Sequence, residues 1–343
     1  MRIKGLFILI LLVLVLTGCE ANFGVADTSD TDGAGETTPI EATPTPTADE
    51  IEDVSEADDD RDTFASETPY DREAKRDLLA LMMAYPNHIA GIERADGFIY
   101  VVMESGSRIV YDDMQSKDFG EKLANADLQD MMELAYPLGD IVLLLEGDFD
   151  PGRIRNYDLL MEVYGGSQSA IEANLEHVQI DAKTYQFNGE NGVAFAMAAV
   201  FAELDDIISD ERVIEEFVYP LASTYYYRVI AGTDRLSLHS FGIAIDLKNV
   251  KTDYWRDATR EQGQARLDVF PREIVAVFEE NGFIWGGKWA HFDLLHFEYR
   301  PELIAKAKYF IEQVDGEPWY QGYPITDETM KLVEIIDDAF NDG

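Results

Sequence analysis

The chain has 343 residues, 46% of them hydrophobic, and carries a formal net charge of −40 at pH 7. This length predicts one large or two modest domains with a real core, and the charge excludes nucleic acid as an expected partner because an acidic chain repels it. Its single cysteine, Cys19, excludes an intrachain disulfide, so the fold must depend on its core or on a metal.

Residues 1–19 have the pattern of a targeting segment. A basic start precedes an apolar run from Leu6 to Leu16, which is too short for a comfortable membrane span. The run ends in Leu-Thr-Gly-Cys19, which resembles the lipobox of bacterial lipoproteins and implies cleavage before Cys19 and lipidation of its thiol. The alternative is an ordinary secretory signal with an incidental cysteine. We expect an extracytoplasmic protein, on the outer face of the cell membrane or in the periplasm, with a lipid anchor at Cys19.

Residues 20–67 have the composition of a disordered linker. They contain 16 acidic residues and one arginine, are rich in Thr, Ala and Pro, and show neither a helical nor a strand period. Such a segment cannot bury enough apolar surface to offset its ordering entropy. We expect it to hold the folded part away from the membrane.

Residues 68–205 mix helical and strand patterns, which predicts an α+β N-terminal region. The apolar spacing predicts helices at 71–85, 128–134, 159–164 and 192–204. Two β-rich runs predict a hairpin of 98–103 and 108–111, and residues 141–145 read as a buried apolar run. The role of this region is not predicted.

The region contains no recognisable catalytic spacing. His88 and His177 are predicted to be structural. Arg153 and Arg155 follow a turn, and a surface salt bridge explains them better than an anion site does.

Residues 206–343 are the second predicted domain. Strands are predicted at 225–230, 243–247 and 293–299, and helices at 271–280 and 301–313. The irregular alternation favours an α+β fold in which helices flank a small antiparallel sheet.

Three of the five histidines lie in two short stretches of this domain, 236–247 and 289–298. On the predicted strand 243–247, Asp246 lies on the face opposite to three aliphatic residues, so its carboxylate is directed at something polar. His239 precedes it by seven residues, and a bend is needed to bring both side chains to one side. Gly242 can supply that bend.

On the other predicted strand, His296 and Glu298 share a face. Two imidazoles and one carboxylate make a three-ligand zinc site with a fourth position for water. We therefore predict a zinc ion held by His239, Asp246 and His296, with Asp293 beside it as the base. Each of these residues has an ordinary structural explanation, but the joint pattern is much harder to produce by chance.

The two stretches resemble the motifs of the VanY-type zinc peptidases. The first, Ser237-Leu-His239-Ser-Phe-Gly242-Ile-Ala244-Ile-Asp246, is similar to Ser-x-His-x-x-Gly-x-Ala-x-Asp. The second stretch resembles the second motif of this family in two places, Trp285-Gly-Gly-Lys-Trp289 and Asp293-Leu-Leu-His296-Phe-Glu298. The family includes D-alanyl-D-alanine carboxypeptidases, VanX dipeptidases and L-alanyl-D-glutamate endopeptidases of phage endolysins. The Asp-x-x-His form is similar to the endolysin-like branch.

The resemblance covers about residues 220–310 and implies zinc at His239, Asp246 and His296 with Asp293 as general base. Glu298 is expected beside the ligands, in support of them. His291 is expected at the rim of the cleft and is not predicted to be a ligand.

Each of the other candidate site residues has two possible roles. The family implies an oxyanion-stabilising arginine upstream of the first motif; Arg228 and Arg235 both qualify, and either can instead pair with a surface acid. Ser237 positions substrate or caps a turn. Trp285 and Trp289 form a cleft wall that binds substrate, or they belong to the core.

We conclude that the sequence predicts a lipid-anchored, zinc-dependent peptidase that hydrolyses peptidoglycan stem peptides, with D-alanyl-D-alanine carboxypeptidase action as the first expectation. The alternatives are an L-alanyl-D-glutamate-type endopeptidase and a non-catalytic lipoprotein that binds zinc or peptidoglycan. An intact Asp293 favours an enzyme, since a binding protein needs no base.

Overall fold

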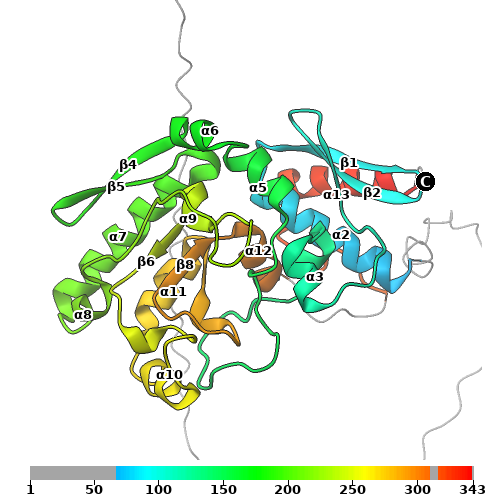
Figure 1. The fold of residues 1–343 in the computed structure, drawn as a ribbon. Coiled ribbons are helices and arrows are strands. Elements are labelled where there is room, and N and C mark those ends of the chain that lie inside the picture. The colour runs from blue at the N-terminus through cyan, green and yellow to red at the C-terminus, as the bar shows by residue number, and fades with distance from the viewer. Residues whose placement is uncertain (1–66, 310–315, 342–343) are drawn as a thin grey trace, which may run out of the picture. The chain divides into compact units, whose positions relative to one another are not determined.

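The computed structural model describes residues 67–309 and 316–341 (Figure 1). The predicted signal segment with Cys19, and the predicted linker up to residue 66, lie outside the described residues. All described residues belong to one compact unit. Within the described part of the chain, none of the helices has the length and apolar character that a membrane span requires.

Helices and short antiparallel sheets alternate along this unit. The α-helices are α2 (Pro69–Ala84), α3 (Phe119–Ala124), α4 (Leu128–Met132), α5 (Tyr157–Tyr164), α6 (Gln168–Ala173), α7 (Val193–Asp210), α8 (Glu215–Val218), α9 (Leu238–Phe241), α10 (Arg260–Leu267), α11 (Arg272–Glu280), α12 (Pro301–Tyr309) and α13 (Asp327–Asn341). The 3-10 turns are η1 (Glu190–Gly192), η2 (Lys251–Asp253) and η3 (Gly286–Lys288). The strands are β1 (Ile89–Ala95), β2 (Phe98–Met103), β3 (Arg108–Val110), β4 (Leu175–Ile180), β5 (Lys183–Asn188), β6 (Ala244–Asp246), β7 (Phe283–Trp285) and β8 (His296–Tyr299).

In the described residues these strands form three sheets, with the orders β1-β2-β3, β4-β5 and β6-β8-β7. All pairs are antiparallel. In Figure 1, helices α11 and α12 lie beside the sheet that contains β8, and α7 lies beside the β4-β5 hairpin. The prediction of an α+β fold with small antiparallel sheets and flanking helices is confirmed.

Two predicted elements are wrong. Residues 141–145 form neither helix nor strand, and Val142 and Leu143 are 77% and 67% exposed. Only Leu144 of this run is buried. The polar groups of this backbone bond instead to α10, since the Leu144 amide donates to Gln264 Oε1 (3.0 Å) and Arg260 donates to the Leu145 carbonyl (2.8 Å).

The second wrong element is the strand predicted at 225–230. This segment forms no regular ladder but a single antiparallel bridge, between Val229 and Leu236, and its backbone bonds to the region of α9. The Tyr226 amide donates to the His239 carbonyl (3.2 Å), and the Arg228 amide donates to Ser240 Oγ (2.8 Å). A side-chain hydroxyl thus replaces a strand partner.

Both predicted regions of the folded part contribute to one hydrophobic core. The division that we predict between residues 205 and 206 falls inside α7, whose Phe201 ring packs edge-on to Phe278 of α11 at 6.5 Å. Tyr85, at the end of α2, donates to Glu302 of α12 (2.7 Å). The division into two domains stays a prediction.

A buried polar cluster also joins the two regions. Lys288 is buried, and its ammonium donates to Glu279 Oε1 (2.5 Å) and to the Pro137 carbonyl (2.7 Å). Tyr136 donates to the same Glu279 oxygen (2.5 Å) and accepts from the Trp285 amide (3.0 Å). Burial lowers the pKa of Lys288, so the carboxylate of Glu279 is what keeps this ammonium charged in the interior.

We therefore expect Glu279→Ala to lower the free energy of unfolding by about 3 kcal/mol, because it leaves a buried ammonium without its counter-ion. Urea denaturation measures this loss. In the double variant Glu279→Ala, Lys288→Met, much of the stability should return, since no charge is then buried. A single variant as stable as the wild type would show that the pair does not hold these regions together.

Candidate metal centre

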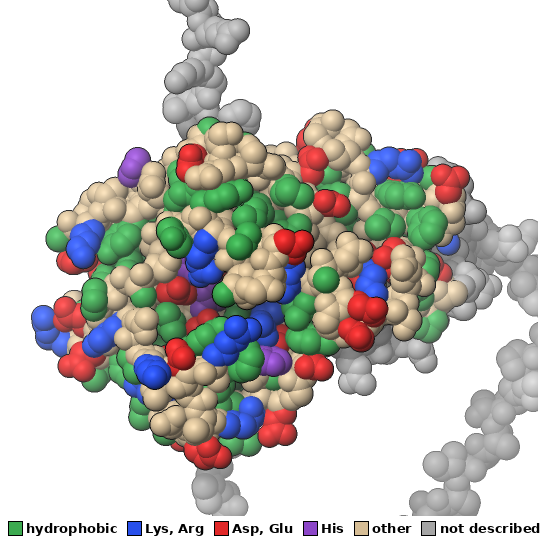
Figure 2. All heavy atoms as spheres, viewed as in Figure 1, with side chains coloured by type: hydrophobic (Ala, Val, Ile, Leu, Met, Phe, Trp, Pro, Cys, Tyr) green, Lys and Arg blue, Asp and Glu red, His purple; other side chains and the backbone are tan. Residues whose placement is uncertain are grey.

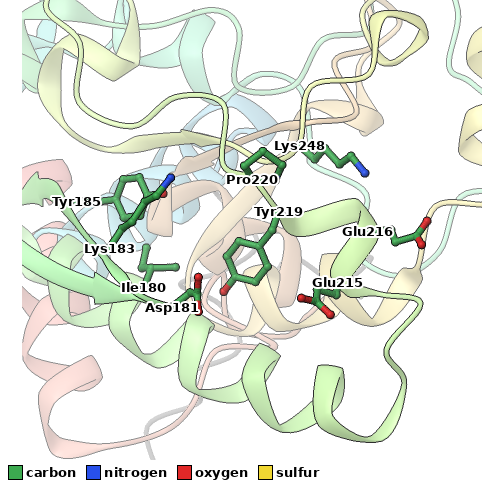
Figure 3. A pocket seen from close by; sticks show the side chains of 9 residues that line it. All are labelled: Ile180, Asp181, Lys183, Tyr185, Glu215, Glu216, Tyr219, Pro220 and Lys248. Atoms are coloured by element: carbon green, nitrogen blue, oxygen red, sulfur yellow. The ribbon is translucent and has the colours of Figure 1, made fainter.

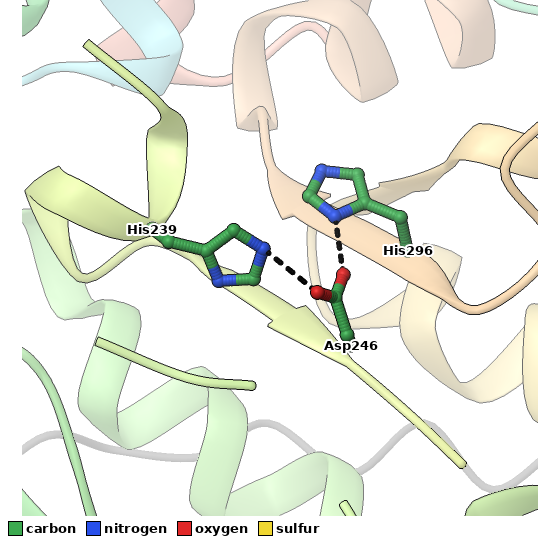
Figure 4. Close-up of side chains that lie close together, drawn as sticks. All are labelled: His239, Asp246 and His296. Carbon is green, nitrogen blue, oxygen red and sulfur yellow. Dashed lines mark hydrogen bonds and ion pairs between the residues drawn. The ribbon is translucent and has the colours of Figure 1, made fainter. Parts of the chain in front are cut away.

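The structure brings His239, Asp246 and His296 together (Figure 4). One ligand atom of each lies within 4.8 Å of the others. Asp246 lies between the two imidazoles: its Oδ2 is 3.2 Å from His239 Nε2, and its Oδ1 is 2.7 Å from His296 Nδ1. The two rings are 5.2 Å apart at their centroids.

Strand register places two of these residues. Asp246 at the end of β6 is the direct partner of His296 at the start of β8, and Ala244 is the partner of Glu298. Directly paired residues of antiparallel strands point to the same face. The predicted face pattern of both strands is therefore found in the sheet.

The third residue comes from a helix and not from a bent strand. His239 lies in the single turn of α9, and Gly242 closes that turn with φ +72°. A Cβ atom on Gly242 would lie 2.9 Å from Leu175 Cδ2 and 3.0 Å from the Asn188 amide nitrogen. The predicted change of direction at Gly242 is present, and it takes the form of a left-handed helix C-cap.

Neighbouring acceptors fix which ring nitrogens face Asp246. The carbonyl of Thr224 lies 2.8 Å from His239 Nδ1, and Glu298 Oε1 lies 3.1 Å from His296 Nε2. Because a carbonyl oxygen and a carboxylate can only accept, these nitrogens carry the proton. The other nitrogen of each ring faces the Asp246 carboxylate, and once it loses its proton it would offer a lone pair to a metal, as is usual for histidine ligands.

The donor set fits a zinc ion, which binds imidazole nitrogen and carboxylate oxygen and takes three protein ligands in its catalytic sites. Burial disfavours the charged form of His296. Its hydrogen bonds to Asp246 and Glu298 have the larger effect and raise the pKa of His296 to about 10. Likewise, against the effect of burial, the neighbouring histidines hold the pKa of Asp246 well below its usual range. A metal ion would take the place of these protons, so its binding releases protons.

Asp293 lies in the turn before β8, not within the strand that we predict at 293–299. It is half-buried, and its buried Oδ1 has no hydrogen-bond partner among the described residues. Burial raises the pKa of Asp293 to about 7. An orphaned carboxylate oxygen is costly, and its presence suggests a functional use.

Gly286 is a positioning residue that the sequence does not single out. A Cβ atom there would lie 2.6 Å from the Asp293 carbonyl oxygen and 3.1 Å from Asp293 Cβ. The Gly286 carbonyl also accepts from the Asp293 amide (2.9 Å). A hydrogen atom in place of a side chain thus lets the turn that carries Asp293 pack directly on η3.

The two predicted arginines lie differently. Arg228 is exposed, whereas Arg235 is half-buried and donates to the Leu123 carbonyl. Burial, with the charges of Arg155 and Arg153, lowers the pKa of Arg235, so these three guanidinium groups form one basic cluster. Neither Arg228 nor Arg235 has a hydrogen bond or ion pair with the three candidate ligands within the described part of the chain.

Sequence reasoning missed Arg153 and Arg155 as site residues. Arg155 forms a buried ion pair with Glu298, and Arg153 lies over the Trp289 ring at 5.9 Å and pairs with the buried Asp150. Both arginines form salt bridges, as predicted, but their carboxylate partners are buried and do not lie on the surface. A basic pair after a turn was the available signal, but its partners are far away in sequence. On the face shown in Figure 2, basic side chains gather near the centre, close to histidine and acidic side chains.

The remaining predicted residues lie around the group. Trp285 is core: it is buried, and its Nε1 donates to the Leu294 carbonyl (2.8 Å). Trp289 is also buried, but its ring lies 5.7 Å from that of His296. Ser237 is buried at the start of α9 and makes no side-chain cap. His291 stands apart from the three candidate ligands and bonds through Nδ1 to Asp150 (2.7 Å).

Two other features do not join this centre. A cavity of about 390 Å³ lies between the β4-β5 turn and α8 (Figure 3), with mixed charges and none of the predicted site residues in its wall. A second acidic group, formed by Asp112, Asp113 and Asp127, holds the ammonium of Lys117, which is 2.9 Å from both Asp113 and Asp127. A protein cation already balances this group.

Residues 231–299 match the model of a peptidase family described as D-alanyl-D-alanine carboxypeptidase. The resemblance to VanY-type peptidases is confirmed over this segment. The match includes the three candidate ligands and Asp293, and it supports a peptidoglycan-related metallopeptidase. No curated protein and no solved structure matches the chain.

We expect His239→Ala and His296→Ala each to weaken zinc binding by more than about 100-fold, beyond the loss typical of residues that only support a ligand. Competition with a chelator measures the affinity. His291→Ala is the matched control, since that imidazole lies outside the group and should leave the affinity unchanged. Equal losses in all three variants would contradict the assignment.

We expect Gly286→Ala to retain zinc and to lower turnover about 10-fold or more, because the added methyl group displaces the turn that carries Asp293. Zinc content and peptide hydrolysis are measured on the same preparation. Gly166→Ala is a useful control for glycine loss, since a Cβ atom there meets nothing within 4 Å and the residue has no positive φ. Full turnover in Gly286→Ala would show that the close approach is not needed.

Proposed function

We propose that the protein is a zinc-dependent peptidase that hydrolyses peptidoglycan stem peptides, and that it acts as a D-alanyl-D-alanine carboxypeptidase. The observation that carries the proposal is the unpartnered, buried carboxylate oxygen of Asp293 on the turn that leads into His296. A binding site for zinc or peptidoglycan alone has no use for a base. The family match supports the general class.

His239, Asp246 and His296 would hold the metal. When bound, a zinc ion supplies Lewis-acid polarisation of a carbonyl and lowers the pKa of water to about 7. Asp293 accepts a proton at its carboxylate and delivers it to the leaving amine. Burial raises the pKa of this carboxyl, which makes it a better proton acceptor than an exposed aspartate.

The side chains around the group exclude water and supply positive charge. Trp289 covers His296 on one side. Of the two predicted arginines, Arg235 is the better candidate for stabilising the oxyanion, because it belongs to the basic cluster with Arg153 and Arg155, whereas Arg228 is exposed. A guanidinium group near a developing negative charge favours the transition state over the ground state.

An L-alanyl-D-glutamate-type endopeptidase is the second candidate. The spacing Asp293-x-x-His296 is similar to that of the endolysin-like branch, and this favours cleavage within the stem peptide. Mass spectrometry of digested, purified peptidoglycan separates the two. Loss of a terminal D-alanine supports the first candidate, and cleavage within the stem supports the second.

We also propose that the enzyme is tethered outside the cytoplasm by a lipid on Cys19, which the apolar run and the Leu-Thr-Gly-Cys19 sequence support. A lipid anchor would keep the peptidase beside its polymeric substrate. Metabolic labelling with a fatty acid, compared between the wild type and Cys19→Ala, tests this. Unlabelled wild-type protein would contradict it.

We expect Asp293→Asn to retain one zinc ion per chain and to lose about 10²- to 10⁴-fold in turnover, the usual contribution of a general base. The amide keeps the volume of the carboxylate but cannot take up the proton. Zinc content and hydrolysis of a synthetic D-alanyl-D-alanine peptide are the two measurements. Loss of the metal would make Asp293 a ligand and exclude it as the base.

A further inference from the structure

A short segment of the N-terminal region, Asp150–Arg155, packs against the second motif. The Trp289 indole donates to the Pro151 carbonyl (2.7 Å), and Arg300 donates to the Gly152 carbonyl (2.7 Å). Arg155 reaches furthest into the site, where its Nη2 donates to Glu298 Oε1. This segment lies outside residues 231–299, which match the family model.

Glu298 is fully buried, and Arg155 is the arginine that forms a hydrogen bond with it. Its strand partner across the sheet is Ala244, which offers only a methyl group. Arg300 Nη1 is 3.6 Å from Oε2, an ion pair that is too long for a hydrogen bond, and its Nε and Nη1 donate to Glu302 (2.6 Å) and to Gly152. A buried carboxylate needs a hydrogen-bonded cation, and Arg155 is the one that meets it.

The oxygen that Arg155 holds is also the one that His296 uses. Glu298 Oε1 accepts from both Arg155 Nη2 and His296 Nε2, the latter at 3.1 Å. The opposite ring nitrogen, Nδ1, is directed at Asp246 (Figure 4). The orientation of the His296 ring, and with it the direction of Nδ1, therefore depends on the position in which Arg155 holds Glu298.

We propose that Arg155 is a positioning residue of the metal centre, which acts through Glu298 to fix the orientation and tautomer of His296. The proposal rests on the proposed function only in taking His296 as a zinc ligand. It gives part of the N-terminal region, residues 68–205, a definite role: one of its side chains completes the centre that the matched segment carries.

Arg155 is also a favourable site for a test. Its Nε has no hydrogen-bond partner among the described residues, so the contact with Glu298 is the ion pair that a substitution would remove.

The experiment measures zinc affinity by chelator competition in the full chain and in Arg155→Gln, Arg155→Lys and Arg212→Gln. We expect Arg155→Gln to weaken zinc binding 10- to 100-fold, the usual effect of losing a residue that supports a ligand. Arg155→Lys should recover most of the affinity, since it restores a cation. Arg212 is 80% exposed in its pair with Glu215, so the same substitution there should change nothing.

A double-mutant cycle with Glu298→Gln separates positioning from a general effect on folding. If Arg155 acts through Glu298, Arg155→Gln should cause no further loss of zinc affinity once Glu298 is replaced. Additive losses, or wild-type affinity in Arg155→Gln, would overturn the proposal. If Arg155→Gln does not fold, unchanged zinc affinity in Glu298→Gln alone would overturn it equally.

Peptide hydrolysis by the same proteins tests the proposed function separately. A wild type that binds zinc but cuts no stem peptide would contradict the peptidase, while the zinc affinities would still decide the role of Arg155. A wild type that binds no zinc would overturn both, and the absence of metal would distinguish that result from the first.

Discussion

The carboxylate of Asp246, held between two imidazoles, is the interaction on which the rest of the site depends. Strands β6 and β8 pair in a register that places Asp246 directly opposite His296. Gly242 ends α9 with a left-handed C-cap, so the chain turns from α9 into β6 and His239 lies beside Asp246. A shift of the register by one residue would send Asp246 to the other face of the sheet. Register and helix cap together therefore define the centre.

Around that interaction the protein keeps several charges out of water, each with a partner. Glu298 is paired with Arg155 and His296, and Glu279 with Lys288. Such pairs add little net stability but are costly to break, so they fix an arrangement. Asp293 is the exception, because neither an ion pair nor a hydrogen bond joins its carboxylate to another of the described residues. That contrast is why it is assigned the proton transfer.

The two strands of the site could be predicted from the sequence because strand parity is a local property. Asp246 opposite three aliphatic residues, and His296 with Glu298, already showed which side chains share a face. The helical turn at His239 could not be separated from a bent strand, because Gly242 permits both. The run 141–145 shows the limit of a hydrophobic pattern, which cannot distinguish a core strand from an exposed loop that bonds to α10.

The contacts of Arg155 and Gly286 could not be predicted from the sequence, for a different reason. Arg155 meets Glu298 only through the packing of a distant segment, and no spacing along the chain signals that contact. At Gly286 a side chain would clash with the backbone of Asp293, and that contact likewise depends on the tertiary fold and not on the local sequence. The motif supplied the candidate ligands and the candidate base, and the three-dimensional structure supplied the residues that pack against them.

The most direct test of the central claim is anomalous diffraction at the zinc edge from crystals of the zinc-loaded protein. The structure predicts one peak bounded by His239 Nε2, the Asp246 carboxylate and His296 Nδ1, with Glu298 still on His296 Nε2. A peak elsewhere, or a metal on His296 Nε2 in place of Glu298, would contradict both the ligand set and the way in which the fold orients it.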